Sequence, residues 1–493
     1  MAGARKASPL LRTVQAFAVI AVICAVTGDI TINTVDPWRE FTQMLRGAAT
    51  PDFTATEDLL HALLLTVAFA LLGVALGALG GFGLALAFHY RIVRAGCATL
   101  RAVHELFWAL IFLQLFGLSP LTGLLAIAIP YAGIFAKVYA EILEEADPRP
   151  LQALPAGTGR ISAFLFVRLP DAWHQFATYT LYRLECGLRS SAILGFVGLP
   201  TLGFHLESAF SQGKYSEVSA LLILFYIVIA TIRWWLRKPL LPVWLVGAVA
   251  VLPWTAGLAP GSVARFFTHD IVSYPLRSGE GWAGMGDWLS LVLVDQALPG
   301  VVATLQLTMV ALVATGLLTM LFFPLISPLL LGRPARGVGH VFLVVVRSTP
   351  EYILAFILLQ LWGPSMLPAI VALALHNGAI IGHLIGRFTE GIELRPDAPR
   401  GFDRYAWEVV PRIYRHMLAL LFYRWEVILR ETAILGMLGI ATLGFYIDSA
   451  FADLRFDRAL LLIAVTALLN LAVDAASRAI RARLRLQTGL RGR

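Results

Sequence analysis

Long runs of apolar residues, separated by short polar segments, dominate the chain from residue 13 to residue 477. A helix that crosses the hydrocarbon core of a bilayer needs about 20 mostly apolar residues. The pattern therefore predicts an all-α membrane protein with about 12 transmembrane helices, six in each half. The candidate spans lie near residues 13–30, 59–88, 102–118, 120–140, 175–198, 216–236, 239–257, 297–325, 341–363, 365–387, 417–440 and 457–477.

Composition agrees with this class, because 58% of the 493 residues are hydrophobic and only 14% are charged. The net charge of +8 comes from Lys and Arg in short runs between apolar segments and near the termini. This is the pattern of cytoplasmic loops, not of a nucleic-acid interface, and it places both termini in the cytoplasm. The three cysteines are widely spaced and indicate neither a disulfide framework nor a metal cluster.

A passage of the sequence occurs twice. Residues 182–210 return as residues 423–451 with the same order of Tyr, Arg, Glu and Arg, then Ala-Ile-Leu-Gly and Thr-Leu-Gly-Phe. The repeat predicts two parallel six-helix halves that face one polar path through the lipid bilayer. The first half is residues 1–238 with a polar insert near 141–173, and the second is residues 239–493 with an insert near 389–415.

Charged residues recur within apolar surroundings in both halves. Arg101 and Glu105 correspond to Arg347 and Glu351, and the spacing of four predicts that each pair shares one face of a helix. The repeated passage holds two Arg against one Glu in each half, and guanidinium groups suit an oxyanion substrate. The alternative is that the pairs are structural and hold helices together. The predicted substrate-path residues are Arg183, Glu185, Arg189, Arg424, Glu426 and Arg430.

Glycines follow the repeated arginines and predict a gate or hinge, with tight helix packing as the alternative. These residues are Gly195, Gly198, Gly203, Gly436, Gly439 and Gly444. His376 and His383 share a helical face, but no Cys or carboxylate is near them in sequence. We interpret them as path-lining or packing residues and predict no metal site and no cofactor.

The two inserts carry the residues of a known motif. Permease subunits of ABC importers have a cytoplasmic Glu-Ala-Ala, a Gly four residues later and a terminal Ile-x-Leu-Pro. Counting back from Leu169-Pro170 places Ala153 and Gly157 in this motif, with Gln152 in place of the Glu. The second copy departs further and keeps mainly Val410-Pro411.

Together with Arg-x-x-Pro-Glu and Tyr-Arg-x-Glu-x-x-x-Arg, these motifs resemble the phosphonate-type permease family. The resemblance implies a type I importer fold with two permease units fused in one chain, in the bacterial inner membrane. It implies a cytoplasmic ATP-binding subunit dimer and a periplasmic substrate-binding protein as partners, for a phosphonate, phosphite or phosphate substrate. The residues that it assigns to ATPase coupling are Ala153, Gly157, Leu169, Pro170, Val410 and Pro411.

An ion-coupled secondary transporter with two parallel halves is the alternative function. The polar insert after the fourth span of each half argues against it. The sequence contains no Gly-x-x-x-x-Gly-Lys-Ser/Thr motif, so ATP hydrolysis is expected in a separate chain and the protein itself is not expected to be an enzyme.

Overall fold

The computed structural model describes residues 9–155, 157–254 and 260–486. These residues form helices, with no strand among them. Among the described residues, seven helices are long and apolar enough to cross a membrane, or up to ten if each of three bent helix pairs is one span. The prediction of a helical multi-span membrane protein is confirmed, and the count of about 12 spans stays a prediction.

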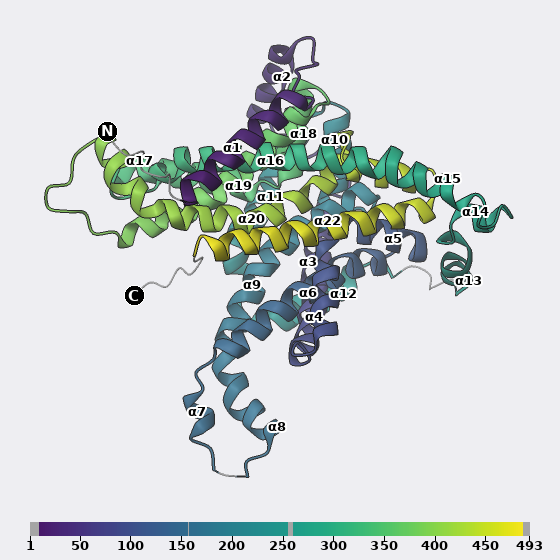
Figure 1. The fold of residues 1–493 in the computed structure, drawn as a ribbon, viewed down its shortest axis with the longest axis horizontal. Coiled ribbons are helices and arrows are strands. Elements are labelled where there is room, and N and C mark those ends of the chain that lie inside the picture. The colour runs from purple at the N-terminus through teal and green to yellow at the C-terminus, as the bar shows by residue number, and fades with distance from the viewer. Residues whose placement is uncertain (1–8, 156, 255–259, 487–493) are drawn as a thin grey trace, which may run out of the picture. The chain divides into compact units, whose positions relative to one another are not determined.

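The helices form two compact units. The first-repeat unit covers Gln43–Ile271, and the second-repeat unit covers the described residues up to Thr42 and from Val272 onward (Figure 1). Helix α2 (Pro37–Ala49) crosses the boundary. The first-repeat unit contains α3 (Leu59–Leu86), α4 (Arg91–Ala102), α5 (Glu105–Phe116), α6 (Pro120–Glu145), α7 (Arg149–Gln152), α8 (Arg160–Ala163), the π-helical turn η1 (Phe164–Arg168), α9 (Leu169–Ile193), η2 (Leu194–Val197), α10 (Leu202–Ser211), α11 (Tyr215–Trp235), η3 (Lys238–Leu240), α12 (Leu241–Val251), α13 (Pro260–Arg265) and η4 (Phe266–Asp270).

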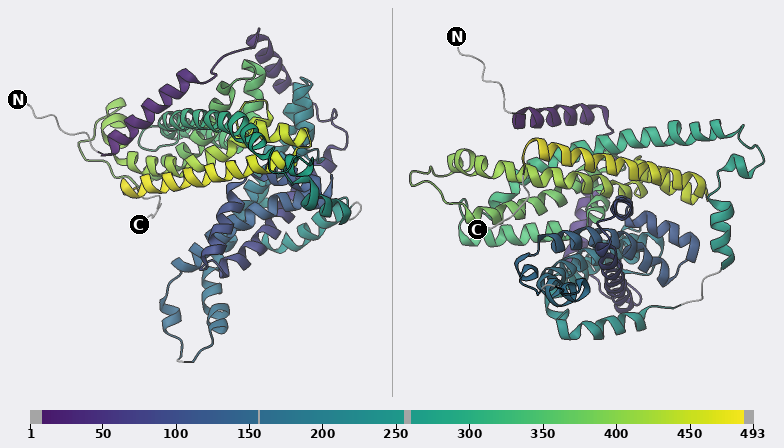
Figure 2. Two further views of the ribbon diagram at one scale, coloured as in Figure 1. Left: turned by 45° about the vertical axis from the view of Figure 1, so that its right-hand side comes forward. Right: turned by 60° about the horizontal axis from the view of Figure 1, so that its bottom comes forward.

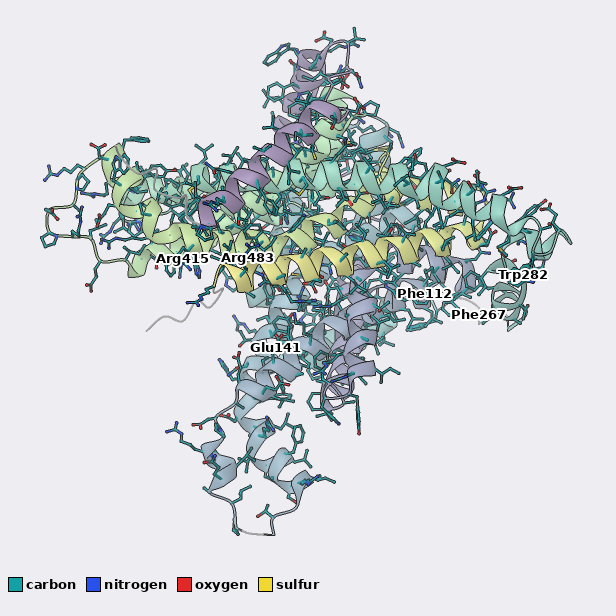
Figure 3. All side chains as sticks on the ribbon, in the orientation of Figure 1. Phe112, Glu141, Phe267, Trp282, Arg415 and Arg483 are labelled. Carbon is teal, nitrogen blue, oxygen red and sulfur yellow. The ribbon has the colours of Figure 1, made fainter. Side chains whose placement is uncertain are left out.

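From η5 (Leu291–Ala297) onward, the second-repeat unit has the same succession of long, short and bent helices as the first-repeat unit has from α3. It contains α1 (Pro9–Thr27), α14 (Tyr274–Arg277), α15 (Met285–Ser290), η5 (Leu291–Ala297), α16 (Leu298–Phe322), η6 (Phe323–Leu325), α17 (Arg333–Ser348), α18 (Glu351–Trp362), α19 (Met366–Phe388), η7 (Thr389–Gly391), the π-helical turn η8 (Arg404–Val409), α20 (Val410–Met437), α21 (Leu443–Ala452) and α22 (Phe456–Arg483). Arg415 and Arg483, labelled in Figure 3, lie where α20 packs on α22, and Arg415 donates to the Leu484 carbonyl.

Each unit takes one apolar helix from the other half of the sequence. Helix α12 belongs to the second half of the sequence but packs on α3 of the first-repeat unit. The N-terminal α1 belongs to the first half but packs on α16 of the second-repeat unit. Phe17 of α1 contacts Phe422 and Trp425 of α20 edge-on, with ring centroids 5.1 and 5.3 Å apart. The compact units therefore divide the chain differently from the sequence repeats, and the division at residues 238 and 239 stays a prediction.

Two predicted single helices are in fact sharply bent. α4 and α5 meet at 90°, and α17 and α18 meet at 91°. His104 and Pro350 occupy the same position before α5 and α18, and both have extended backbones. The residue before a proline is biased away from the helical region, which explains the second break. The prediction that Arg101 and Glu105, or Arg347 and Glu351, share one face of a helix was therefore wrong.

The repeated glycines lie where backbones touch. A Cβ added to Gly203 would be 1.7 Å from the Ala192 carbonyl oxygen, and one added to Gly444 would be 2.2 Å from that of Ala433. These positions fold α10 against α9 and α21 against α20, and no side chain fits between them. In both units a Thr side chain of the first long helix of the repeat, α3 or α16, stabilises the bend, because Thr66 accepts from the Leu202 amide at 2.8 Å and Thr304 from the Leu443 amide at 3.1 Å.

Candidate functional site

The predicted substrate-path residues lie on two equivalent helices, α9 and α20. Among these residues of the first-repeat unit, Arg183 has the best-defined side-chain contacts. Its Nε donates to the Tyr179 hydroxyl at 2.8 Å, and its guanidinium carbon lies 5.3 and 5.7 Å from the ring centroids of Tyr179 and Tyr182. Cation–π contacts of this kind stabilise a charge that is removed from water.

Glu105 stands beside these helices at the start of α5. The Ser190 hydroxyl of α9 donates to Glu105 Oε1 at 2.8 Å, and the Tyr131 hydroxyl of α6 lies 3.2 Å from Ser190 Oγ. Three helices thus meet through one chain of hydrogen bonds. We call Glu105, Tyr131 and Ser190 the first polar cluster.

The equivalent place in the second-repeat unit is more highly charged. Glu351 of α18, His376 of α19 and Glu431 of α20 are all buried, and their ligand-type atoms lie within 4.8 Å of one another. Asn377 donates to Glu431 Oε2 at 3.1 Å and accepts from Arg424 at 3.3 Å. We call Glu351, His376, Asn377, Arg424 and Glu431 the second polar cluster.

Of the six predicted path residues, Arg424 contacts the second polar cluster through Asn377. Arg189 lies on α9, where its Nη2 is 3.5 Å from Cys186 Sγ, and Glu185, Glu426 and Arg430 lie on the same two helices. Their role in a substrate path stays a prediction. Sequence reasoning missed Ser190, Tyr131, Asn377 and Glu431, and it interpreted His376 as a path-lining or packing residue. The sequence did contain a signal for this cluster. At the position directly after the matched Arg189 and Arg430, the first repeat has Ser190 and the second repeat has Glu431.

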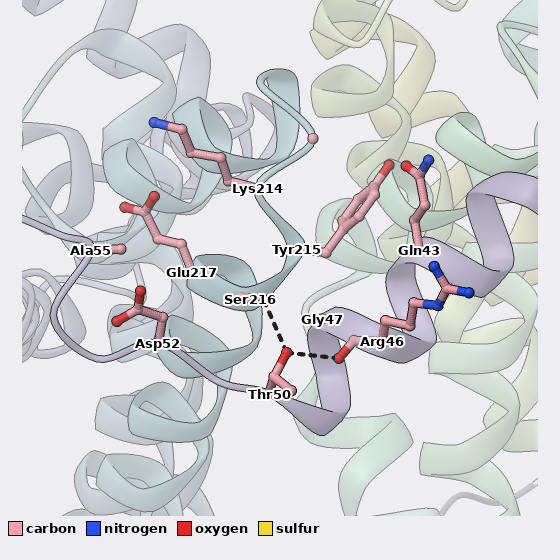
Figure 4. Close-up of a pocket in the computed structure, with 11 residues that line it drawn as sticks. Gln43, Arg46, Gly47, Thr50, Asp52, Ala55, Lys214, Tyr215, Ser216 and Glu217 are labelled. Atoms are coloured by element: carbon pink, nitrogen blue, oxygen red, sulfur yellow. Dashed lines mark hydrogen bonds between the residues drawn. The ribbon is translucent and has the colours of Figure 1, made fainter.

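A cavity of about 500 Å³ lies elsewhere in the first-repeat unit (Figure 4). It is bounded by the end of α2 and the start of α11. Its wall holds both signs of charge, from Arg46, Asp52, Lys214 and Glu217. Thr50 Oγ1 donates to the Arg46 carbonyl at 3.0 Å and lies 3.2 Å from Ser216 Oγ. None of the predicted path residues is among the described residues that line it.

The first insert extends from the ends of α6 and α9 and carries α7 and α8 (Figures 1 and 2). Glu141, labelled in Figure 3, lies near the end of α6 from which the insert leaves. Ala153 is the C-cap of α7, and Gly157 has a φ of +96°, a conformation that favours glycine. Leu169 and Pro170 form the first turn of α9, and Arg168 ties this turn to the Leu143 carbonyl.

The second insert is held by a buried acid. Glu408 is 4% exposed, accepts from the Arg395 backbone amide at 3.3 Å and pairs with the side chains of Arg395 and Arg412. It stands where the first insert has Val167. The departure from the motif therefore replaces an apolar residue with an ion-paired one. Val410 and Pro411 begin α20 as Leu169 and Pro170 begin α9.

Both inserts expose large apolar side chains at matching positions. Ile161 and Phe166 are 76% and 79% exposed in the first insert, and Phe402 and Trp407 are 77% and 76% exposed in the second. The pairs correspond under the same alignment that matches Pro170 with Pro411. We call them the first and second apolar pairs. Sequence reasoning missed them, although large apolar residues at matched positions in a polar insert were a readable signal.

Comparison with known proteins finds no matching family model and no matching solved structure. The chain is 26% identical over 422 residues to the phosphate-import permease protein PhnE of Mycolicibacterium smegmatis, covering 80% of this chain and 78% of PhnE. It is 29% identical over 229 residues to the phosphite transport system permease protein PtxC of Stutzerimonas stutzeri, covering 44% of this chain and 82% of PtxC. A match over 80% of the chain includes parts of both repeats.

Proposed function

This chain is a homologue of the phosphonate-type transport permeases, and from that relationship we propose that it moves a phosphorus oxyanion through the bacterial inner membrane as the membrane subunit of an ABC importer. Its relatives are transport permeases, so the chain is a membrane transport subunit and not itself an enzyme. The observation that carries the proposal is the match to PhnE, which extends over parts of both repeats.

The transport step that we propose is alternating access by two fused permease units. A cytoplasmic ATPase dimer closes on ATP, the inserts near 141–173 and 389–415 move with it, and the helices around the path change their packing. A periplasmic substrate-binding protein delivers the anion. The surplus Arg of the repeated passage supplies positive charge for phosphonate, phosphite or phosphate.

The apolar pairs support a direct role of both inserts in this coupling. Large apolar side chains that are about three-quarters exposed gain most when a partner buries them. Both inserts present such a pair despite the divergence of their motifs. We therefore propose that each insert contacts one ATPase subunit, the first through Ile161 and Phe166 and the second through Phe402 and Trp407.

The test is uptake by lipid vesicles that contain the chain, a candidate ATPase and a candidate binding protein. Labelled phosphate, phosphite and a phosphonate are supplied in turn, with ATP inside or outside the vesicles. We expect uptake of at least one of these anions only with ATP on the ATPase side and with both partners present. Uptake that an imposed proton gradient drives without ATP would contradict the proposal and favour a secondary transporter.

A further inference from the structure

The second polar cluster has the donor set of a metal site. One imidazole nitrogen and two carboxylates, on α18, α19 and α20, bring their ligand atoms within 4.8 Å of one another. Imidazole suits zinc and neighbouring transition metals, and carboxylates suit zinc and manganese as well. We propose that Glu351, His376 and Glu431 bind a divalent transition-metal ion, with Zn²⁺ or Mn²⁺ as the fitting class.

The hydrogen bonds around these residues orient them as ligands. A backbone carbonyl only accepts, so the contact of 2.8 Å between His376 Nδ1 and the Thr349 oxygen places the proton on Nδ1. The other nitrogen, Nε2, is then the one that faces Glu351, at 3.7 Å from Oε2. Glu431 is held in turn by Asn377. Outer contacts of this kind fix the tautomer and the direction of metal ligands.

The distances also permit an ion after small side-chain movements. With tetrahedral zinc bonds of about 2.0–2.2 Å, two ligand atoms are about 3.3–3.6 Å apart. His376 Nε2 and Glu351 Oε2 are already 3.7 Å apart, and the outer limit of 4.8 Å for the three ligand atoms is about 1.2–1.5 Å wider than that spacing. Rotation of a Glu side chain covers such a difference, because its terminal torsion is broad.

Comparison of the repeats shows which buried charges a bound cation would offset. In the first polar cluster, the place of Glu431 is taken by Ser190, whose hydroxyl donates to the single carboxylate Glu105. The second cluster adds a second buried carboxylate and a His in the same fold. Two buried carboxylates at this distance repel each other and lose hydration, and a divalent ion offsets both costs. The charges of Arg424 and Arg430 act on Glu431 from α20 and compensate part of its charge, and Arg424 also donates to Asn377 of α19.

The direct test is metal content. The full chain, purified in detergent without chelators, is equilibrated with Zn²⁺ or Mn²⁺, freed of unbound ion and measured by mass spectrometry of the elements. We expect about one ion per chain, and a loss of affinity of at least tenfold in Glu431→Ser, which copies the first repeat, and in His376→Gln. Matched controls are Glu105→Gln in the first cluster and His383→Gln on the same helix as His376, which are expected to keep the ion.

Two further readouts keep the result clear if a variant folds poorly. Co²⁺ added to the wild-type chain is expected to give visible absorption bands that Zn²⁺ removes, and Zn²⁺ is expected to raise the Tm of the wild-type chain but not of Glu431→Ser. The proposal is overturned if the wild-type chain holds no more metal than Glu431→Ser. It is equally overturned if infrared spectra of metal-free and metal-treated chain show the same protonated carboxyl band, lost in Glu431→Gln, because the two carboxylates then share a proton.

Discussion

The two repeats keep the same backbone contacts but differ in the polar side chains that those contacts position. Gly203 and Gly444 touch the preceding helix in the same way, and Thr66 of α3 and Thr304 of α16 accept the same hydrogen bond from the first residues of α10 and α21. At the equivalent buried place, however, the first unit has one carboxylate and the second has two with a His. The shared contacts are requirements of the fold, and the proposed metal site is confined to the second unit.

The largest expected effect comes from the shared glycines. In Gly203→Val and Gly444→Val, the new side chain meets backbone at 1.7 and 2.2 Å, which no rotamer relieves. We expect each to lower the free energy of unfolding by about 3 kcal/mol or more, seen as loss of monodisperse protein and of Tm. Gly83→Ala is the control, because nothing lies within 4 Å of the added atom. A tolerated change at only one of the two sites would show that the bends are not equivalent.

The next prediction concerns transport and tests whether the divergent second insert still couples to the ATPase. We expect Phe166→Ala and Trp407→Ala each to lower ATP-driven uptake about tenfold, since an anchoring side chain at an interface contributes at least about 1.4 kcal/mol. Ser162→Ala and Asp403→Ala occupy matched exposed positions in the two inserts and are expected to have little effect. The measurement is initial uptake rate in vesicles with ATPase present. A defect in Phe166→Ala alone would restrict coupling to the first insert.

The sequence predicted a helical membrane protein because long apolar runs are what a bilayer-spanning helix requires. The repeated passage also identified the glycines at the two bends and the Thr-Leu-Gly-Phe segments that begin α10 and α21. Sequence analysis missed the bends at His104 and Pro350, because apolar residues continue through both breaks. The spacing of apolar residues also carries no information about the direction of the helix axis. The second polar cluster was missed because Glu351, His376 and Glu431 are distant in sequence and become neighbours only when α18, α19 and α20 pack.

A smaller effect is expected inside the second insert. Glu408→Gln removes the charge that pairs with Arg395 and Arg412. The acid is buried but both arginines are partly exposed, so we expect a cost of about 1–2 kcal/mol, below the 3–5 kcal/mol of a fully buried pair. Hydrogen exchange of residues 392–409 should become faster. Glu390→Gln, which removes an exposed partner of Arg387, is the control and should leave this segment unchanged. Unchanged exchange in Glu408→Gln would show that the acid does not hold the insert.

The smallest effect belongs to the first insert, where the ion pair is exposed. Hydrogen bonds from the Arg149 side chain and amide lower the pKa of Asp147 from its usual value of 3.8. A carboxyl whose pKa is lower in the folded state stabilises that state above its unfolded pKa, and the stabilisation is lost as pH falls through the folded pKa. We therefore expect exchange of residues 147–153, corrected for intrinsic rates, to stay constant from neutral pH down to the usual range of Asp and to rise only below it. Asp147→Asn should be slightly faster at neutral pH and lack this rise. A rise near neutral pH in the wild-type chain would contradict the assignment to Asp147, and it would point instead to a group with a higher pKa in the same segment.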